Sequence, residues 1–410
     1  MKELKGAAIF GQSGGPTAVF NSSAAGVIMT ALKQKCITKM YGAKHGIVGM
    51  LNEDFCDMSL EDPYELELMK TTPSSALGSV RYKLKDADVD DTDYKRLLEV
   101  FKKYNIRYFF YNGGNDSMDT CNKISKYMQK SGYEIRCMGV PKTIDNDLFG
   151  TDHCPGYGSA AKYVATSVME VYQDARVYDK GMVIIMEMMG RNAGWLTAAS
   201  ALASCNGMGP DLIYLPERDF DMDKFLADVE KVWKKNGNVF VAVSEGTHYA
   251  DGRLIGDTGY KDAFGHAQLG GVALTLADAV KGKLGCKVRA IELNLLQRCA
   301  AHCGSKTDVE EAFMAGETAV LKAVEGYTDY CIGFERAPGK RYKCEAKLIS
   351  LSEVANTEKK VPDEYINAEG NNVNEKFIEY ALPLVRGESR PPYRNGLPRY
   401  AKLKKIVVKK

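Results

Sequence analysis

The chain has 410 residues, of which 45% are hydrophobic and 26% are charged. This composition supplies one large core or two ordinary ones and excludes a disordered protein. Its 55 Lys and Arg against 53 Asp and Glu leave a formal charge of +2, which argues against nucleic acid or an anionic membrane surface as the main partner.

Apolar runs and cysteines restrict the compartment. The longest apolar runs, near 183–189 and 239–243, are strand-sized and fall short of the ~20 residues that span a bilayer. The first residues, MKELKGAAIFGQSGG, lack the apolar region and cleavage site of a signal peptide. Eleven cysteines without a Cys-x-x-Cys pair exclude a secreted disulfide scaffold. We therefore expect a reduced, cytoplasmic protein with no membrane partner.

The chain begins with the pattern of a strand, a glycine turn and a helix. A mostly apolar run at 5–10 leads into the turn Gly11-Gln-Ser-Gly-Gly15, and helical spacing of apolar residues follows over 19–32. The pattern recurs, with strands expected at 108–111, 137–140, 182–189 and 239–244 and helices at 117–128 and 195–203, the former capped by Asp116 or Ser117. This alternation predicts an α/β protein with mostly parallel sheets and helices on both faces.

Chain length favours two doubly wound, Rossmann-like lobes over one. We expect the first lobe at 1–157, with part of 297–340 returning to it, and the second at 158–296. The glycine-rich stretches 264–271 and 289–304 are expected to recross between them. Residues 341–410 are interpreted as a C-terminal extension that packs on the lobes and ends in an edge strand with a basic, solvated tail. Ligands in such folds bind beyond the carboxyl ends of the strands, so we expect the active site in the cleft between the lobes.

Two glycine turns could contact phosphate or metal. The backbone amides of the turn 11–17 could face a phosphate, although the turn matches neither a Walker loop nor a dinucleotide fingerprint, and a plain structural turn explains it equally well. The turn Gly113-Gly-Asn-Asp-Ser117 places Asp116 at a strand end, where a carboxylate can hold Mg²⁺. Capping of the next helix is the alternative role for Asp116.

The stretch Pro141-Lys-Thr-Ile-Asp-Asn-Asp147 carries the most specific chemistry. A carboxylate that takes a proton from an attacking hydroxyl, beside a cation for a phosphoryl group, explains its Lys, Thr and two Asp residues together. An Asp-rich turn alone would leave Lys142 unexplained.

Further candidates follow later strands. Arg191, in Met188-Met-Gly-Arg191, stands at a helix start that favours an anionic ligand, and Glu245 follows the strand at 239–244. Arg289 and Arg298 lie on one segment suited to a second phosphate, although surface ion pairs are the commoner role of either arginine. A zinc site at Cys299, His302 and Cys303 is disfavoured, because only one loose cluster has metal spacing.

Together these stretches resemble 6-phosphofructokinases, in the same order along the chain from about residue 6 to 310. The combination of TIDND with MGR-x-AG is highly specific. The segments that carry the resemblance are SGGPTAVFN (13–21), LGSVRYK (77–83), GGNDS (113–117), PKTIDND (141–147), MGRNAGW (189–195), SEG (244–246) and the R-x8-R segment (289–298).

Two positions make the chain similar to the diphosphate-dependent members of that family. ATP-using members have glycine where this chain has Asp116 and Lys142. Glycines leave room for the inner phosphate of an adenine nucleotide, whereas these side chains fill that space. Lys142 also places a cation where the leaving phosphate develops charge.

The resemblance implies reversible, in-line phosphoryl transfer from diphosphate to the 1-hydroxyl of fructose 6-phosphate, with Mg²⁺ as cofactor. The first lobe would bind the donor and the second the sugar phosphate. It also implies a homodimer or homotetramer, because some sugar-phosphate contacts come from a neighbouring subunit. The implied roles are Asp145 as general base, Thr143 as the residue that positions the sugar or phosphoryl oxygens, Asp147 as support for the base or metal, Lys142 and Arg81 as charge-stabilising residues, Asp116 as a donor-site and metal residue, Gly15 as a backbone donor to diphosphate, Met189, Gly190, Arg191 and Glu245 as sugar contacts, and Arg289 and Arg298 as 6-phosphate contacts.

Departures from the family pattern keep other hypotheses open. Asn115 replaces a metal-binding aspartate of most relatives, so Asp116 or Asp147 would carry more of the metal. Leu295 stands where relatives often place His or Tyr at the sugar. An ATP-dependent phosphofructokinase and a catalytically inactive sugar-phosphate-binding subunit are the alternatives. A Rossmann oxidoreductase would need the glycine fingerprint and an acidic ribose-binding residue, which the sequence lacks.

Overall fold

The computed structural model describes residues 4–261, 267–269, 271–339, 341–355 and 357–409. They form two compact units, Met1–Ser159 with Arg298–Glu358 and Gly387–Lys410, and Ala160–Gln297 with Lys359–Arg386. The segment 341–410, expected as one C-terminal extension, is therefore divided between both units. Residues 264–266 and 270 lie outside the described residues. They belong to the glycine-rich stretch expected at 264–271. Among the described helices, none has the length and apolar character that a membrane span requires.

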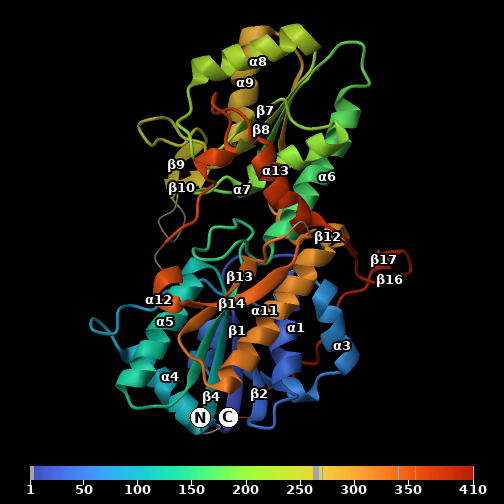
Figure 1. Cartoon of the computed structure of the whole chain (residues 1–410). Helices are drawn as coiled ribbons and strands as arrows, with labels where there is room; N and C mark the ends of the chain where they lie inside the picture. The colour runs from blue at the N-terminus through green and yellow to red at the C-terminus, as the bar shows by residue number, and fades with distance from the viewer. Residues whose placement is uncertain (1–3, 262–266, 270, 340, 356, 410) are drawn as a thin grey trace. The chain divides into compact units, whose positions relative to one another are not determined.

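A seven-stranded sheet forms the centre of the first unit (Figure 1). The strands β1, β2, β4, β5 and β13 are parallel to their neighbours in this set, while the edge strands β3 and β14 run antiparallel. In spatial order the strands are β14 (Cys344–Ser350), β13 (Tyr330–Arg336), β5 (Arg136–Pro141), β4 (Ile106–Gly113), β1 (Gly6–Gln12), β2 (Ile37–Ala43) and β3 (Phe55–Asp57).

Both faces of this sheet are buried, as expected for a parallel sheet covered on each side. Alternate residues of β1 and β4 belong to two different apolar clusters, because successive side chains point to opposite faces. One cluster includes α1 (Phe20–Ala31) and α11 (Lys306–Glu325), which lie side by side in Figure 1. The other includes α2 (Gly46–Leu51), α4 (Thr92–Lys103) and α5 (Asn115–Lys130).

The second unit has a smaller sheet of four parallel strands. Its apolar cluster packs α8 (Met222–Asn236) and α9 (Val272–Leu284) against the strands. The strand order is β11 (Val288–Glu292), β6 (Val183–Met188), β8 (Val239–Ser244) and β7 (Leu212–Tyr214). The fold is thus α/β with two mostly parallel sheets, as the alternating pattern predicts.

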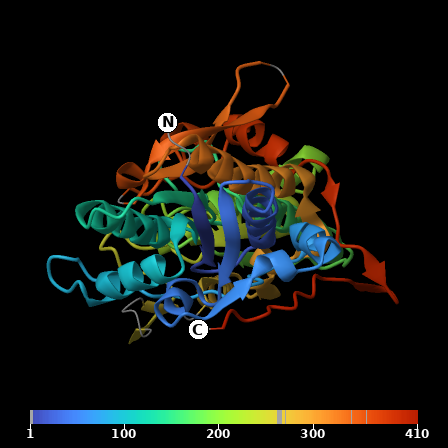
Figure 2. The ribbon, with the colours of Figure 1, turned by 90° about the horizontal axis from the view of Figure 1, so that it is seen from below.

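The basic C-terminal tail is bound through its backbone, while the side chains of Lys402, Lys404, Lys405 and Lys409 are exposed as expected. Its backbone pairs with β3, where the Asp57 amide donates to the Ile406 carbonyl at 3.0 Å and the Val408 amide to the Phe55 carbonyl at 2.9 Å. The buried Glu61 accepts from the backbone amides of both Lys404 and Lys405 at 2.7 Å. In Figure 2 this tail, drawn in red, runs along the blue edge of the sheet to the C-terminus. Glu61 was not apparent as its anchor from sequence.

The predicted elements match the structure closely, with two corrections. Neither Asp116 nor Ser117 caps the helix expected at 117–128, because α5 already begins at Asn115 and Gly114 occupies its N-cap. The helix expected at 195–203 is α-helical only as α7 (Trp195–Ala199) and continues as a 3-10 helix over Ser200–Asn206.

The remaining helices and strands are short or peripheral to the two sheets, apart from the long helix α6. They are α3 (Pro63–Leu68), α6 (Tyr157–Ala175), α10 (Leu296–Cys299), α12 (Leu351–Val354), α13 (Glu375–Ala381), β9 (Asp257–Lys261), β10 (Ala267–Leu269), β12 (Gly304–Ser305), β15 (Glu388–Ser389), β16 (Tyr393–Arg394) and β17 (Leu397–Pro398).

The crossing of α1 and α11 generates a stability prediction. A Cβ on Gly26 would overlap the Phe313 carbonyl oxygen, whereas a Cβ on Gly282, in α9, would meet no atom within 4 Å. We expect Gly26→Ala to lower the free energy of unfolding by about 1–3 kcal/mol through overpacking. Gly282→Ala should raise it by about 0.5–1 kcal/mol, because alanine reduces the entropy of the unfolded chain. Urea unfolding curves measure both, and equal effects would contradict the close approach of the helices.

Candidate active site

Three loops meet at the carboxyl ends of neighbouring strands in the first unit. The strands β1, β4 and β5 are parallel neighbours, with Gln12 opposite Asn112 and Gly113 opposite Pro141. Backbone bonds continue beyond the strands, from the Ser13 amide to the Asn112 carbonyl at 2.9 Å and from the Lys142 amide to the Gly113 carbonyl at 3.0 Å. The two glycine turns and the segment 141–147 are therefore adjacent, as the strand-end argument predicts.

Lys142 is the buried cation of this site. Its side chain is 4% exposed, and its Nζ lies 3.4 Å from the position of a Cβ on Gly14 and 5.0 Å from the centre of the Phe20 ring. Burial lowers the pKa of Lys142 to about 8, although Asp145 and Asp147 oppose this shift. Since burying a charge without full compensation is unfavourable, an ammonium here favours an anionic ligand.

Two arginines add positive charge beside the first glycine turn. Arg298 Nη1 lies 3.0 Å from the position of a Cβ on Gly15, so only glycine fits there without displacing the guanidinium. The Gly14 amide donates to the Val80 carbonyl at 3.0 Å. The exposed Arg81 follows Val80 in sequence, so this bond keeps the backbone at Arg81 close to the turn. Both arginines lower the pKa of Lys142 further, as neighbouring cations do. The turn is thus surrounded by positive charge.

The segment 143–147 forms a tight turn that presents its two carboxylates. Thr143 is buried, and its Oγ1 accepts from the Asp145 amide at 3.1 Å. Asn146 adopts a left-handed conformation with φ of 56°. Asp145 and Asp147 on either side of it are half-buried. The turn therefore keeps Thr143 buried and leaves both Asp residues partly exposed.

Asn115 and Asp147 supply an acceptor pair that fits a hard cation. Asn115 Nδ2 donates to Asp147 Oδ2 at 3.2 Å. Asn115 Oδ1 and Asp147 Oδ1 are both buried and, within the described part of the chain, have no hydrogen-bond partner. Burial also raises the pKa of Asp147. Unsatisfied oxygen acceptors next to a desolvated carboxylate fit Mg²⁺, which prefers oxygen ligands. Asp116, in contrast, is exposed in the first turn of α5.

In the second unit, Gly190 and Glu245 lie together at the ends of β6 and β8. The Gly190 amide faces Glu245 Oε1 at 3.4 Å, and Ser244 Oγ donates to the Gly190 carbonyl at 2.6 Å. Gly190 has φ of 132°, which favours glycine. Burial raises the pKa of Glu245, and Arg191 opposes that shift. The structure thus brings Gly190 and Arg191, from one predicted segment, together with Glu245 from another.

Other predicted residues of the second unit lie around this pair or apart from it. The half-buried Met189 follows β6 directly, and its amide donates to Gln297 Oε1 at 3.2 Å. Arg289 is exposed on β11, and Leu295 is 53% exposed in the loop after that strand. Arg298, grouped with Arg289 by sequence, belongs to the first unit and lies at Gly15.

Glu187 is a buried carboxylate that sequence reasoning missed. It is 8% exposed on β6 and accepts from the Ala273 amide at 2.8 Å. Burial raises the pKa of Glu187 to about 7, and Glu292 and Glu245 contribute to the rise. The available signal was a single acidic residue inside the apolar run Val183-Ile-Ile-Met-Glu-Met188.

None of the eleven cysteines forms a disulfide, and Cys299 is exposed. In the described part of the chain, the group of His, Cys and acidic residues close enough to share a metal is His153, Glu311 and Cys344 instead.

The chain is similar to known proteins over most of its length. The family model described as "Phosphofructokinase" matches residues 7–320. The chain belongs to the phosphofructokinase family. This assignment covers both units and every loop described above.

Individual relatives extend the similarity to almost the whole chain. The chain is 45% identical over 407 residues to a pyrophosphate--fructose 6-phosphate 1-phosphotransferase of Halomonas elongata, covering 98% of this chain and 97% of the relative. A crystal structure of a pyrophosphate-dependent phosphofructokinase from Nitrosospira multiformis matches with a TM-score of 0.89 and 43% identity, covering 98% of each chain. A sulfofructose kinase of Alkalicoccus urumqiensis is 33% identical, covering 87% of this chain and 91% of the relative.

Glu187 generates a prediction on stability and pH. Its folded-state pKa of about 7 exceeds the ordinary value of 4.5, so the folded state holds the proton more tightly than the unfolded state. Stability is therefore lost as the pH rises from about 4.5 to about 7. Between pH 5 and pH 8, the free energy of unfolding of the native protein should fall by about 2 kcal/mol relative to that of Glu187→Gln.

Urea unfolding at the two pH values measures this difference. Glu230→Gln, at an exposed ion pair with Lys234 on α8, is the matched control and should show little of it. If the free energy of unfolding changed equally with pH in the native protein and in Glu187→Gln, that result would contradict a buried, protonated Glu187.

Proposed function

We propose that the protein is a diphosphate--fructose-6-phosphate 1-phosphotransferase, which transfers a phosphoryl group reversibly from diphosphate to the 1-hydroxyl of fructose 6-phosphate. The observation that carries the proposal is the buried Lys142 ammonium at the glycine turn, with Arg298 and Arg81 beside it. The names of the Halomonas and Nitrosospira relatives support the same activity.

Lys142 supports diphosphate rather than ATP as the donor. Its Nζ lies 3.4 Å from the position of a Cβ on Gly14, so the side chain would take up space that an additional phosphate of a nucleotide needs. The same charge neutralises the leaving phosphate of diphosphate, and neutralisation at a buried site is stronger than in water. One side chain therefore excludes one donor and assists the other.

Asp145 is the proposed general base. Its carboxylate takes the proton of the sugar 1-hydroxyl as that oxygen bonds to the transferring phosphorus and the bond from phosphorus to the leaving phosphate breaks. Thr143 fixes the backbone of Asp145 through the bond at 3.1 Å and would position the phosphoryl oxygens. Lys142, Arg81 and the Gly15 amide stabilise charge on the transferring and leaving groups.

Asn115 and Asp147 are the proposed Mg²⁺ ligands, with Asp116 as a further candidate. When bound, the ion would neutralise charge on the diphosphate oxygens. The amide of Asn115 is a neutral ligand, so the carboxylate of Asp147 would supply most of the attraction for the ion.

The second unit would hold the sugar phosphate. Glu245 and the backbone at Met189 and Gly190 suit sugar hydroxyls, since carboxylates and amides pair with them readily. Arg191 and Arg289 suit the 6-phosphate, with Arg298 and Leu295 as the remaining predicted contacts. We further propose a homodimer or homotetramer in the cytoplasm, and the absence of disulfides among the eleven cysteines supports that compartment.

Removal of the base should abolish transfer but preserve binding. We expect Asp145→Ala to lower kcat by about 10²–10⁴-fold in both directions, because no other group takes the hydroxyl proton. Fructose 6-phosphate affinity, measured by calorimetry, should change little. Asp88→Ala, at an exposed carboxylate of the same unit, is the control and should retain full activity. Near-native turnover by Asp145→Ala would refute the assignment.

Donor choice is tested with diphosphate and ATP in parallel coupled assays. The native protein should use diphosphate and ignore ATP, and the reverse result would overturn the proposed function. Lys142→Gly with Asp116→Gly should lower kcat/KM for diphosphate by about 10²–10³-fold, through lost charge stabilisation. Asp116→Gly alone should have the smaller effect, because Asp116 is exposed and Lys142 is buried. The single effects need not add, since both residues shape one pocket.

A further inference from the structure

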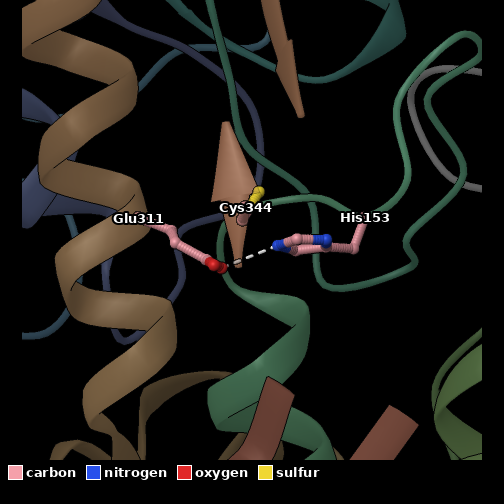
Figure 3. A group of neighbouring side chains, drawn as sticks. All are labelled: His153, Glu311 and Cys344. Atoms are coloured by element: carbon pink, nitrogen blue, oxygen red, sulfur yellow. Dashed lines mark hydrogen bonds and ion pairs between the residues drawn. The ribbon is translucent and has the colours of Figure 1, made fainter. Parts of the chain in front are cut away.

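A buried histidine lies between two carboxylates just beyond the segment 141–147. His153 is 2% exposed. Its Nδ1 lies 2.8 Å from Asp152 Oδ1, and its Nε2 lies 2.7 Å from Glu311 Oε2. Figure 3 shows the Glu311 side chain reaching from its helix to the imidazole, with Cys344 nearby. Both ring nitrogens therefore face carboxylate oxygens at hydrogen-bond distance.

This geometry determines the protonation state of His153. A neutral imidazole has one N–H group, so its other nitrogen would direct a lone pair at a carboxylate oxygen. Two N–H groups satisfy both contacts, and only the imidazolium has them. Burial lowers the pKa of His153, but the bonds to Asp152 and Glu311 outweigh burial and raise it above 6.5. The two contacts at hydrogen-bond distance therefore favour the protonated ring.

The elements packed around the ring complete the charge balance. On β13, Arg336 Nη2 donates to Asp152 Oδ1 at 2.9 Å. The Tyr342 hydroxyl donates to Glu311 Oε1 at 2.6 Å, and the Cys344 thiol lies on β14 with its pKa raised by burial. Two cations, His153 and Arg336, therefore face two anions, Asp152 and Glu311. Neutral Tyr342 and Cys344 lie beside them, and the Phe334 ring of β13 stacks on the imidazole with 5.0 Å between the ring centres.

The loop 152–156 is fastened to α11 by two carboxylates three residues apart. Glu311 holds His153, while the buried Asp308 accepts from the amides of Gly156 at 2.9 Å and Ser159 at 2.8 Å. Residues three apart lie on one helix face, so α11 presents both carboxylates to the same loop.

The other side of this loop supports the proposed catalytic turn. The Cys154 amide donates to Asn146 Oδ1 at 2.9 Å, and the Thr143 amide donates to the Pro155 carbonyl at 3.2 Å. Thr143 and Asn146 flank Asp145 on both sides. The position of the proposed base therefore depends on a loop that His153 anchors to α11.

We propose that His153, as an imidazolium shared by Asp152 and Glu311, is a positioning residue that holds the turn 143–147 in the geometry needed for phosphoryl transfer. The inference rests on the proposed function for its catalytic consequence. Its structural part, the protonated ring and the anchored loop, stands independently of the substrate.

A metal is the competing occupant of this cluster. One ligand atom each from His153, Glu311 and Cys344 lie within 4.8 Å of one another. Zinc accepts these ligand types, and the Asp152 contact to Nδ1 resembles the outer partner of a metal-bound histidine. We favour the proton, because the 2.7 Å contact between Nε2 and Glu311 leaves no room for an ion between them.

Three variants separate charge from packing. His153→Gln leaves Glu311 without its cation, and Glu311→Gln leaves the imidazolium with one carboxylate fewer. The double variant removes both charges and keeps polar groups of similar size. We expect each single variant to lower kcat by about 10²-fold through misplacement of Asp145, with KM for fructose 6-phosphate nearly unchanged. The double variant should recover most of the loss, and His248→Gln, at the partly exposed histidine of the second unit, should behave as native.

Hydrogen exchange measures how firmly the loop 152–156 and the turn 143–147 are held, and it does not depend on enzyme activity. Peptides spanning 141–156 should exchange faster in both single variants and return toward the native rate in the double variant. If the native protein lacks diphosphate activity but shows this exchange pattern, the proposed function fails and the anchor stands. Unchanged exchange and unchanged kcat in His153→Gln would overturn the anchor.

Protonation is observed directly by NMR of ¹⁵N-histidine-labelled protein. The chain has five histidines, so His153→Gln identifies the signals of His153. We expect both of its ring nitrogens to carry protons at pH 7. Since the folded-state pKa is raised, the stabilisation is complete below about pH 6.5 and is lost as the pH rises through that raised value. A neutral ring at pH 7, or one zinc per chain by elemental analysis, would overturn the proposal.

Discussion

The burial of the Lys142 ammonium is the constraint on which the site depends. A 4% exposed cation beside two arginines is unfavourable unless anions compensate it. Asp145 and Asp147 provide part of that compensation within the chain. A bound anion at the glycine turn would provide the rest. The lowered pKa of Lys142 and the proposed preference for a small, highly charged donor both follow from this arrangement.

The fold supplies the rigidity that such an arrangement requires. The loops at 13–15, 113–115 and 141–147 leave three adjacent parallel strands whose side chains are buried on both faces. Behind the third loop, α11 holds residues 153–159 through Asp308 and Glu311. The charged residues of the site therefore lie on loops that leave a buried sheet. This attachment limits how far their like-charged side chains can move apart. The same logic explains why the paired carboxylates of α11 are buried rather than solvated.

Sequence predicted those features that depend on neighbouring residues in the chain. The strand 239–244 and the glycine turns were identified because apolar runs and glycine punctuation are local. The position of Arg298 beside Gly15 was not apparent from sequence, because the segment that it shares with Arg289 passes from one unit to the other at residue 298. His153 gave no signal, since its partner Glu311 is 158 positions away in the chain. Glu61 likewise meets the tail only after both have folded onto one edge of the sheet.

The most direct test of the central claim is the proton uptake that accompanies binding of Mg²⁺ and diphosphate. Calorimetry at pH 8.5 in two buffers of different ionisation enthalpy measures it. With a pKa of about 8, Lys142 is mostly neutral in the free protein at this pH. The account predicts that the native protein takes up about 0.7 proton per site more than Lys142→Arg, whose guanidinium is already charged. Equal proton uptake by the two proteins would contradict it.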